Sequence, residues 1–373
     1  MNWIKSKMGS QGWDITDDDV KKPSVLFLGP MRYAHQEMED FQEYFVVKFH
    51  EGNRDDLIRR LKKGKYDGFA AIVWNSQDPS LSFKVDKELV SYLPASLSLI
   101  SIPAAGYNNV DVEACTARGI LVTNTAGVVS AATADTAMFL MLGCLRHFSQ
   151  GQTVLREGSW KNQGMPKGHD MACKTVGILG LGGIGKAIAK RATAFGMVVN
   201  YYNRTRVDIR VEAEYNAQFV AYETLLRESD VIVVCVPLNS STRHLIGAAQ
   251  FEKMKTGVVI VNIARGPIID EAALVAALDS GKVSSAGLDV FEFEPKVHEG
   301  LLKHPRCTLL PHMGTFTEET SLDMENLTIR NTKNYLMHGE KKNAVNKIEN
   351  AKPLETMMTD SVDISKLSLT LQG

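Results

Sequence analysis

The chain has 373 residues, of which 44% are hydrophobic and 23% charged, a balance typical of globular proteins and unlike that of disordered chains. Its 42 basic and 43 acidic residues leave a net charge of −1, so no excess of positive charge is available to bind nucleic acid or an anionic membrane. At roughly 150 residues per domain, this length predicts two or three domains.

Apolar runs alternate with segments of helical spacing through the first third of the chain. The runs are predicted strands and cover residues 25–29, 44–49, 68–74, 97–105 and 119–124. Leu57, Ile58 and Leu61 are spaced for one face of a helix, and the basic residues within 59–63 are interpreted as its solvated face. Strands that alternate with helices predict a parallel, doubly wound sheet.

A longer helical segment, from about residue 131 to 157, precedes a second series of strands. Between them lies a loop rich in Gly, Pro and Lys at 158–173. The second series is predicted at residues 175–180, 197–202, 230–236, 257–263, 285–290 and 307–310. Six strands with helices between them match a six-stranded dinucleotide-binding sheet. From residue 317 the chain is again helical, and beyond Pro353 it is polar.

A glycine-rich motif connects the first strand of the second series to a helix. Residues 180–185 are Gly-Leu-Gly-Gly-Ile-Gly, which is the GxGxxG pattern. Gly180 permits the tight turn, Gly182 lets the backbone approach a pyrophosphate, and Gly185 lets helix and strand pack closely. The first N–H groups of the helix then face the phosphates. This context favours a dinucleotide-binding turn over a purely structural one.

The next strand ends at residues 202–206 in Tyr-Asn-Arg-Thr-Arg, where NAD-binding sheets usually carry an acid for the ribose 2′-hydroxyl. Asn203 lacks the charge that would repel a 2′-phosphate, and Arg204 or Arg206 can pair with one. We therefore expect NADP in preference to NAD. The alternative is a polar turn in an enzyme that accepts both cofactors.

Polar residues follow the last three strands of the second series. Arg265 comes after the fourth strand, Glu294 after the fifth and His312 after the sixth. In an open α/β sheet, ligands bind beyond the carboxyl ends of the strands, so these side chains can converge beside a dinucleotide. Each residue alone is consistent with a structural role, and their joint occurrence is what predicts a catalytic set.

This set suits the reduction of a 2-keto acid, which needs a hydride at C2 and a proton on the carbonyl oxygen. His312 can supply the proton, because histidine side chains titrate near neutral pH. Glu294 can orient the imidazole and favour its protonated form. Arg265 can pair with the substrate carboxylate and stabilise charge on the carbonyl oxygen. Asp289 can position the nicotinamide amide.

Together these motifs resemble the D-2-hydroxyacid dehydrogenase family, which includes the glyoxylate/hydroxypyruvate reductases. The matching stretches lie within roughly residues 95–345 and comprise 105–111, 124–128, 132–135, 180–185, 262–266, 287–295 and 311–314. The resemblance implies an α/β protein with two doubly wound parallel-sheet domains and a cleft between them. A flavodoxin-like substrate domain would comprise residues 1–130 and 318–373, and a Rossmann NAD(P)-binding domain residues 131–317.

The resemblance also implies the roles of individual residues. Arg265, Glu294 and His312 would be the catalytic set. The backbone amides of Ala105 and Gly106 would hold the substrate carboxylate, with Arg265 and His312 also in contact with substrate. The implied cofactor contacts are Gly180, Gly182, Gly183, Ile184, Gly185, Asn203, Arg204, Thr205, Val236, Pro237, Thr242, Ile263, Ala264, Asp289 and Gly314. No metal ion is implied.

Two positions depart from the pattern of the family. The family often has an acid where Asn203 stands, so a preference for NAD is in doubt. It often has Arg or Lys at the position of Gly183, so one possible phosphate contact is missing.

Two other functions remain open. Corepressors that resemble this family use the fold to sense a dinucleotide and recognise a partner, but the chain has no peptide groove or nuclear signal that the sequence reveals. Formate-type dehydrogenases of the same superfamily typically replace the Glu by Gln, so Glu294 and His312 together favour hydroxyacid chemistry.

Candidate substrates are glyoxylate, hydroxypyruvate and an aryl or alkyl glyoxylate such as phenylglyoxylate. Trp74 and Phe316 can line an apolar pocket for a bulky substrate, or they can pack between the domains. The family implies a homodimer formed through the helix at 131–157 and the arm at 158–173. The alternative is that this helix is interior to the monomer.

The cysteines and the absence of targeting segments predict a cytoplasmic enzyme. The five cysteines are far apart and form no Cys/His cluster, which argues against a disulfide framework or a zinc site. The N-terminus has no apolar core for a signal peptide, and no uncharged apolar stretch reaches the ~20 residues that span a bilayer. We expect small 2-keto and 2-hydroxy acids as partners, and neither nucleic acid nor membrane.

Overall fold

The computed structural model describes residues 22–75, 81, 83–161 and 165–348. They form two compact units, which are considered separately. Unit 1 comprises the residues up to Ala126 together with those from Ser321 onward, and unit 2 comprises Gly127–Thr320. Each unit contains one sheet, and every ladder between named strands is parallel. The prediction of an α/β protein with two doubly wound parallel sheets is therefore confirmed. The polar tail beyond Pro353 lies outside the described residues.

Unit 1 is a five-stranded sheet of order β2-β1-β3-β4-β5 with helices between the strands. Its elements are β1 (Ser24–Leu28), α2 (His35–Gln42), β2 (Val46–His50), α3 (Arg54–Lys62), β3 (Phe69–Trp74), α4 (Lys87–Tyr92), β4 (Leu99–Ser101), α5 (Val112–Ala117), β5 (Leu121–Thr123) and most of α14 (Glu318–His338).

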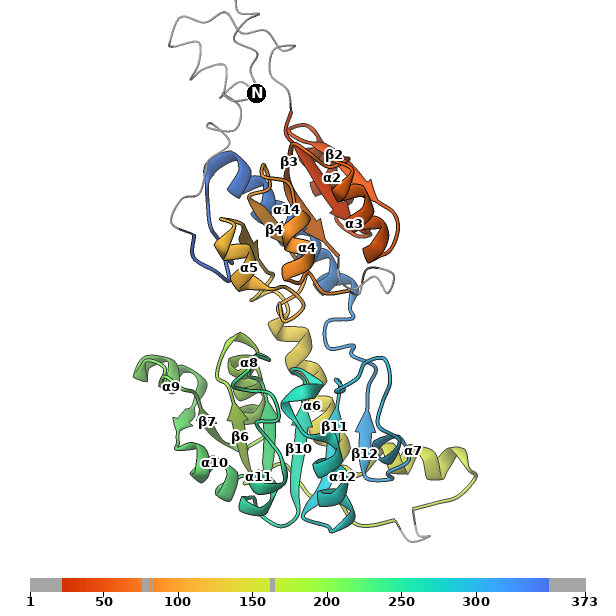
Figure 1. The fold of residues 1–373 in the computed structure, drawn as a ribbon. Helices are drawn as coiled ribbons and strands as arrows, with labels where there is room; N and C mark the ends of the chain where they lie inside the picture. Colours follow the sequence, from red (N-terminus) through yellow and green to blue (C-terminus); the bar gives the residue numbers. More distant parts are fainter. Residues whose placement is uncertain (1–21, 76–80, 82, 162–164, 349–373) are drawn as a thin grey trace, which may run out of the picture. The chain divides into compact units, whose positions relative to one another are not determined.

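Both faces of this sheet are buried. Successive side chains of a strand point to opposite faces, so one strand contributes to two apolar clusters. In β1, Leu26 and Leu28 pack into one apolar cluster, and Val25 and Phe27 pack into another with Ile329 of α14. The helix α14, drawn in blue in Figure 1, thus completes unit 1, although its residues from Ser321 onward follow unit 2 in the sequence.

The carboxylate of Glu325 fastens α14 to the loop after β1. It accepts hydrogen bonds from the backbone N–H groups of Arg32, Tyr33 and Ala34 at 2.8–2.9 Å. Three N–H donors to one buried carboxylate make a strong, directional attachment. This contact joins two segments of unit 1 that are distant in sequence.

Unit 2 is a seven-stranded sheet of order β12-β11-β10-β9-β6-β7-β8. Its elements are α6 (Ser130–Arg146), α7 (Phe148–Arg156), β6 (Thr175–Leu179), α8 (Gly183–Ala194), β7 (Val198–Tyr202), α9 (Ile209–Tyr215), β8 (Ala217–Phe219), α10 (Tyr222–Glu228), β9 (Val231–Val234), α11 (Ala248–Lys253), β10 (Val258–Asn262), the 3₁₀ turn Gly266–Ile268, α12 (Glu271–Asp279), β11 (Val283–Leu288), α13 (Glu299–Leu302) and β12 (Cys307–Leu309). The strand order reverses between β6 and β9, where doubly wound sheets bind dinucleotides.

Two predictions for unit 2 were wrong. The sheet has seven strands and not six, because the three-residue β8 pairs with the edge of β7. The predicted helix over 131–157 is two helices, because His147 adopts a left-handed conformation (φ 54°) that ends α6. Its N–H closes the helix on the carbonyls of Gly143 and Cys144. No helix in the described part of the chain is both long enough and apolar enough to cross a membrane.

Candidate active site

The turn between β6 and α8 has the geometry that the glycine motif predicts. Gly180 has φ +104°, and a Cβ there would lie 2.9 Å from the carbonyl oxygen of Cys235. A Cβ on Gly185 would lie 2.2 Å from the carbonyl oxygen of Gly180, so only glycine lets α8 pack on the turn. Gly182 faces open space, and as the N-cap of α8 it offers no side-chain acceptor to the first N–H groups of the helix. This end of α8 therefore fits a phosphate group.

Of the side chains of Asn203, Arg204 and Arg206 after β7, two have hydrogen-bond partners within unit 2 and one has none among the described residues. The Oδ1 of Asn203 accepts a hydrogen bond from the N–H of Leu181 (2.8 Å), so it stabilises the glycine turn. The guanidinium of Arg206 binds both oxygens of Glu212 at 2.7 Å, which holds the pKa of that carboxyl at about 2. Arg204 is exposed and has no side-chain hydrogen bond or ion pair with the residues described. Of the two arginines predicted from the sequence, Arg204 is the one that remains available.

His312 and Glu294 form a hydrogen-bonded pair beyond the ends of β11 and β12. The Nδ1 of His312 lies 2.8 Å from Oε2 of Glu294, and Oε1 of Glu294 accepts from the N–H of Phe291 at 2.8 Å. Burial by itself would raise the pKa of Glu294, but the hydrogen bond and charge of His312 outweigh it and lower this pKa below its ordinary value. The carboxylate is thus ionised and fixed in orientation.

A buried aspartate holds the backbone on which His312 sits. His312 has φ +52°, an uncommon conformation for a residue other than glycine. Its N–H donates to the carbonyl of Asp289, whose two carboxylate oxygens accept from the N–H groups of Met313 and Gly314 at 2.8 Å. Asp289 therefore shapes this loop, a role that the sequence analysis did not anticipate. Its contact with the nicotinamide amide stays a prediction.

Arg265 leaves β10 on a turn that Asn262 stabilises. Asn262 is 1% exposed; its amide donates to the carbonyl of Arg265 and accepts from the N–H of Ala264. Burial lowers the pKa of Arg265, and the nearby charge of Glu294 opposes this shift. The structure thus brings Arg265, Glu294 and His312 together at one edge of the unit 2 sheet.

The other predicted cofactor residues lie on the same carboxyl edge of the unit 2 sheet or next to it. Val236 and Pro237 follow β9, and the hydroxyl of Thr242 donates to the carbonyl of Pro237 at 2.7 Å. Ile263 and Ala264 follow β10, and Gly314 lies two residues after His312. Ile184 is the second residue of α8, and Thr205 lies in the loop after β7. A Cβ on Gly314 would lie 3.0 Å from the Asp289 carboxylate, so this position is closely packed.

The predicted anion-binding residues Ala105 and Gly106 belong to unit 1, in the loop after β4. Asn124 donates to the carbonyl of Ala105 at 2.7 Å and holds the loop in place. Within the described residues, neither the N–H of Ala105 nor that of Gly106 donates a hydrogen bond. Both remain available for a carboxylate.

The residues proposed for an apolar pocket differ in exposure. Trp74 is 1% exposed in the core of unit 1, where its indole N–H donates to the carbonyl of Leu81. Its ring stacks on Phe83 and fills that core, so Trp74 does not line an open pocket within unit 1. Phe316 is 78% exposed.

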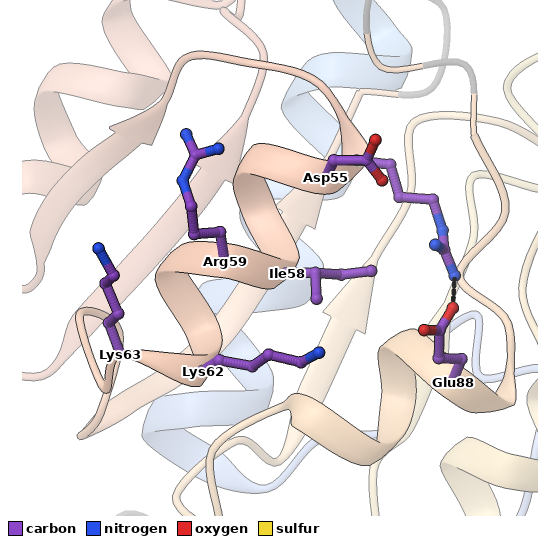
Figure 2. Close-up of a pocket in the computed structure, with 7 residues that line it drawn as sticks. Asp55, Ile58, Arg59, Lys62, Lys63 and Glu88 are labelled. Atoms are coloured by element: carbon purple, nitrogen blue, oxygen red, sulfur yellow. Dashed lines mark hydrogen bonds and ion pairs between the residues drawn. The ribbon is translucent and has the colours of Figure 1, made fainter.

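A hollow of about 590 Å³ on unit 1 lies along α3 and α4 (Figure 2). Most of its cations are already engaged: Arg54 pairs with Glu88 at 2.7 Å, Arg59 pairs with Asp56, and Lys62 lies 4.4 Å from the Tyr92 ring centre. Arg59 and Lys62 of α3 are exposed, as is Lys63 directly after it, in agreement with the solvated helix face inferred from the sequence. The hollow contains no histidine or cysteine, and nothing in its lining resembles the pair formed by His312 and Glu294.

No group of three or more His, Cys, Asp or Glu side chains in the described residues is arranged to hold a metal ion.

Comparison with known proteins places this geometry in context. The sequence model of the D-isomer specific 2-hydroxyacid dehydrogenase NAD-binding domain matches residues 138–314. The chain is 46% identical over 319 residues to 4-methyl-2-oxopentanoate reductase A of Aspergillus oryzae, covering 85% of this chain and 96% of the relative.

Solved structures are similar over the same extent. A glyoxylate reductase from Paecilomyes thermophila is 44% identical with a TM-score of 0.84, over 87% of this chain and 98% of that one. The holo D-mandelate dehydrogenase of Rhodotorula graminis is 34% identical with a TM-score of 0.83, over 88% and 98% of the two chains.

Proposed function

The chain belongs to the D-isomer specific 2-hydroxyacid dehydrogenase family, and from this premise we propose which of its residues carry the reaction. The resemblance inferred from the sequence is confirmed, and the chain is an NAD(P)H-dependent oxidoreductase that reduces 2-keto acids. None of the similar proteins described above is a corepressor or a formate dehydrogenase. The two alternative functions therefore have no support.

We assign unit 2 as the cofactor domain and unit 1 as the substrate domain. The assignment of unit 2 is supported by the NAD-binding model, whose match at 138–314 falls inside it, and by the open glycine turn before α8. The assignment of unit 1 is supported by the unengaged N–H groups of Ala105 and Gly106.

In the proposed mechanism, His312 is the general acid of reduction. The bound nicotinamide supplies the hydride that C2 of the keto acid receives. Protonated His312 donates a hydrogen bond from Nδ1–H to Glu294. The proton on Nε2 of His312 is then free to be transferred to the carbonyl oxygen of the substrate. Arg265 pairs with the substrate carboxylate and stabilises negative charge on that oxygen. In the reverse direction, neutral His312 accepts the hydroxyl proton.

The observation that carries this proposal is the 2.8 Å contact between His312 Nδ1 and Glu294 Oε2. The second oxygen of Glu294 is held by a backbone N–H, so the carboxylate cannot rotate freely away from the imidazole. An ionised, fixed carboxylate that accepts a hydrogen bond from Nδ1–H sets the tautomer of the ring and leaves Nε2 to face the substrate. Such an arrangement orients a catalytic histidine.

We further propose that the cofactor is NADPH. Asn203 places an uncharged amide at the end of β7, and its oxygen is occupied by the N–H of Leu181. Arg204, next to it, is exposed and has no partner among the described residues, so it can pair with a 2′-phosphate. The family model itself describes an NAD-binding domain.

We propose a cytoplasmic homodimer that associates through α6, α7 and the arm that follows. Four large apolar side chains are exposed there: Phe139 (46%), Phe148 (44%), Leu155 (60%) and Trp160 (63%). Large apolar side chains exposed along one stretch of chain favour burial against a partner. All five cysteines are free, which supports a reducing compartment. Gel filtration with light scattering measures the oligomeric state.

The substrate is proposed to be glyoxylate, hydroxypyruvate or an aryl or alkyl glyoxylate such as phenylglyoxylate. The experiment is a comparison of kcat/KM over this panel with NADPH and with NADH, with chiral analysis of the product. We expect NADPH oxidation and a D-2-hydroxy acid. The absence of turnover with every 2-keto acid, or an L product, would contradict the proposal.

A further inference from the structure

Glu292 lies two residues before Glu294, in the loop after β11 (residues 289–297, the β11 loop), and its side chain is only 8% exposed. Its Oε1 accepts hydrogen bonds from Nε2 of His244 at 2.7 Å and from Nη2 of Arg243 at 3.1 Å. Both partners belong to the loop after β9 (residues 235–246, the β9 loop). One carboxylate thus ties the β9 loop to the loop that carries Glu294.

The backbone of Glu292 is fixed from the other side. Its N–H donates to Oε1 of Glu271, the first residue of α12, at 2.8 Å. A Cβ on Gly266 would lie 2.3 Å from the nitrogen of Glu292 and 1.8 Å from the carbonyl carbon of Phe291. The turn that follows Arg265 therefore packs directly against the Phe291–Glu292 peptide, and only glycine permits this approach.

The β9 loop is held in a strained conformation where it meets Glu292. His244 has φ +48°, in the left-handed region that residues other than glycine rarely adopt. Its N–H donates to the carbonyl of Pro267 at 2.8 Å, and its ring donates to Glu292. Such a conformation persists only where surrounding contacts hold it, and strained residues cluster at functional sites.

Three loops therefore meet at Glu292: the β9 loop, the turn after Arg265 and the β11 loop. We propose that Glu292 is a positioning residue that fixes the β9 loop, with Pro237 and Thr242, against the loop that carries Glu294, and thereby sets the affinity for the dinucleotide. This inference rests on the proposed function, because that function places Pro237 and Thr242 against the cofactor. Glu292 itself is not proposed to touch substrate or cofactor.

The test uses the full-length enzyme with Glu292→Ala. Without cofactor, hydrogen–deuterium exchange of peptides covering residues 235–246 should rise, while exchange in the strands of unit 2 stays as in the wild type. The dissociation constant for NADPH, measured by its fluorescence, should rise about tenfold, the loss typical of removing a hydrogen bond to a charged group. Glu292→Gln, which keeps an acceptor for His244, should give an intermediate value.

Glu223→Ala is the matched control. Glu223 pairs with Lys253 at 3.0 Å between α10 and α11 of the same unit, with both side chains at least half exposed. This control should change neither loop exchange nor NADPH affinity. If Glu292→Ala does not fold, His244→Ala removes the shorter of the two hydrogen bonds to Glu292 from an exposed position, and it should raise loop exchange and the NADPH dissociation constant in the same direction but less.

The outcomes separate this inference from the proposed function. Raised exchange confined to the β9 loop with weakened NADPH binding supports the positioning role, whatever the wild-type turnover of 2-keto acids. Unchanged loop exchange, unchanged affinity, or a rise in exchange throughout unit 2 would overturn it. Failure of the wild type to reduce 2-keto acids would instead overturn the proposed function.

Discussion

Replacing Glu294 by Gln removes the negative charge beside His312 while keeping the size of the side chain and one acceptor oxygen. The contact between Nδ1 of His312 and Oε2 of Glu294 is 2.8 Å long, and a hydrogen bond to a charged group contributes about 1.5–3 kcal/mol. The two side chains are 45% and 35% exposed, so screening by solvent places the loss at the lower end of this range, about 1.5 kcal/mol. Since about 1.4 kcal/mol is a factor of ten in rate, kcat/KM should fall about tenfold.

The assay is the pH profile of kcat/KM for reduction of a 2-keto acid, followed by the absorbance of the reduced nicotinamide. Burial raises the pKa of Glu294, but the hydrogen bond and charge of His312 outweigh it and lower this pKa, so the carboxylate acts at neutral pH and loses its effect as pH falls through the lowered value. In Glu294→Gln we therefore expect about a tenfold loss of kcat/KM at neutral pH and a difference from wild type that shrinks in acid. Glu299→Gln, at an 81% exposed position that pairs with Lys303, is the control and should leave the pH profile unchanged. A kcat/KM of Glu294→Gln equal to wild type at neutral pH, or an equal loss at every pH, would refute the reasoning.

Three further substitutions test other parts of the account. Arg204→Ala should raise KM for NADPH about tenfold or more and leave KM for NADH nearly unchanged; equal effects on both would exclude a 2′-phosphate contact. Arg206→Ala removes the guanidinium that lowers the pKa of Glu212 to about 2. Because the pKa of this carboxyl is near 4.5 in the unfolded chain, the pair stabilises the fold above about pH 4.5, and this stabilisation is lost as pH falls toward 2. Urea unfolding at pH 7 should therefore show a less stable variant than wild type, with the difference shrinking in acid; a constant difference would contradict the assignment. Asp289→Asn turns an amide donor toward backbone N–H groups of the His312 loop, so we expect a loss of about 2–3 kcal/mol of unfolding free energy and a lower kcat; wild-type values for both would contradict its anchoring role.

Local sequence patterns were enough to predict the elements whose conformation depends on residues close to each other in the chain. The run at 175–180 followed by Gly180–Gly185 predicted a strand, a tight turn and a helix, and the φ of +104° at Gly180 has the cause that was inferred. The alternation of apolar runs and helices predicted both parallel sheets. The positions of Arg265, Glu294 and His312 after successive strands predicted their convergence, because the carboxyl ends of parallel strands share one edge.

Other features depend on contacts between segments distant in sequence. The strand β8 has only three residues, and its pairing with β7 rather than its composition makes it a strand. No glycine or proline marks the break at His147, so the helix pattern there continues on both sides. The roles of Asp289 and Glu292 come from backbone N–H groups and side chains of other loops, which no local spacing reveals.

The most direct test of the central claim is the single-turnover rate of ketone reduction by His312→Gln with NADPH bound. If the imidazole held by Glu294 delivers the proton, this rate should fall at least about a hundredfold while the dissociation constant for NADPH stays within about twofold of wild type. A rate within a few-fold of wild type at full cofactor occupancy would contradict the account.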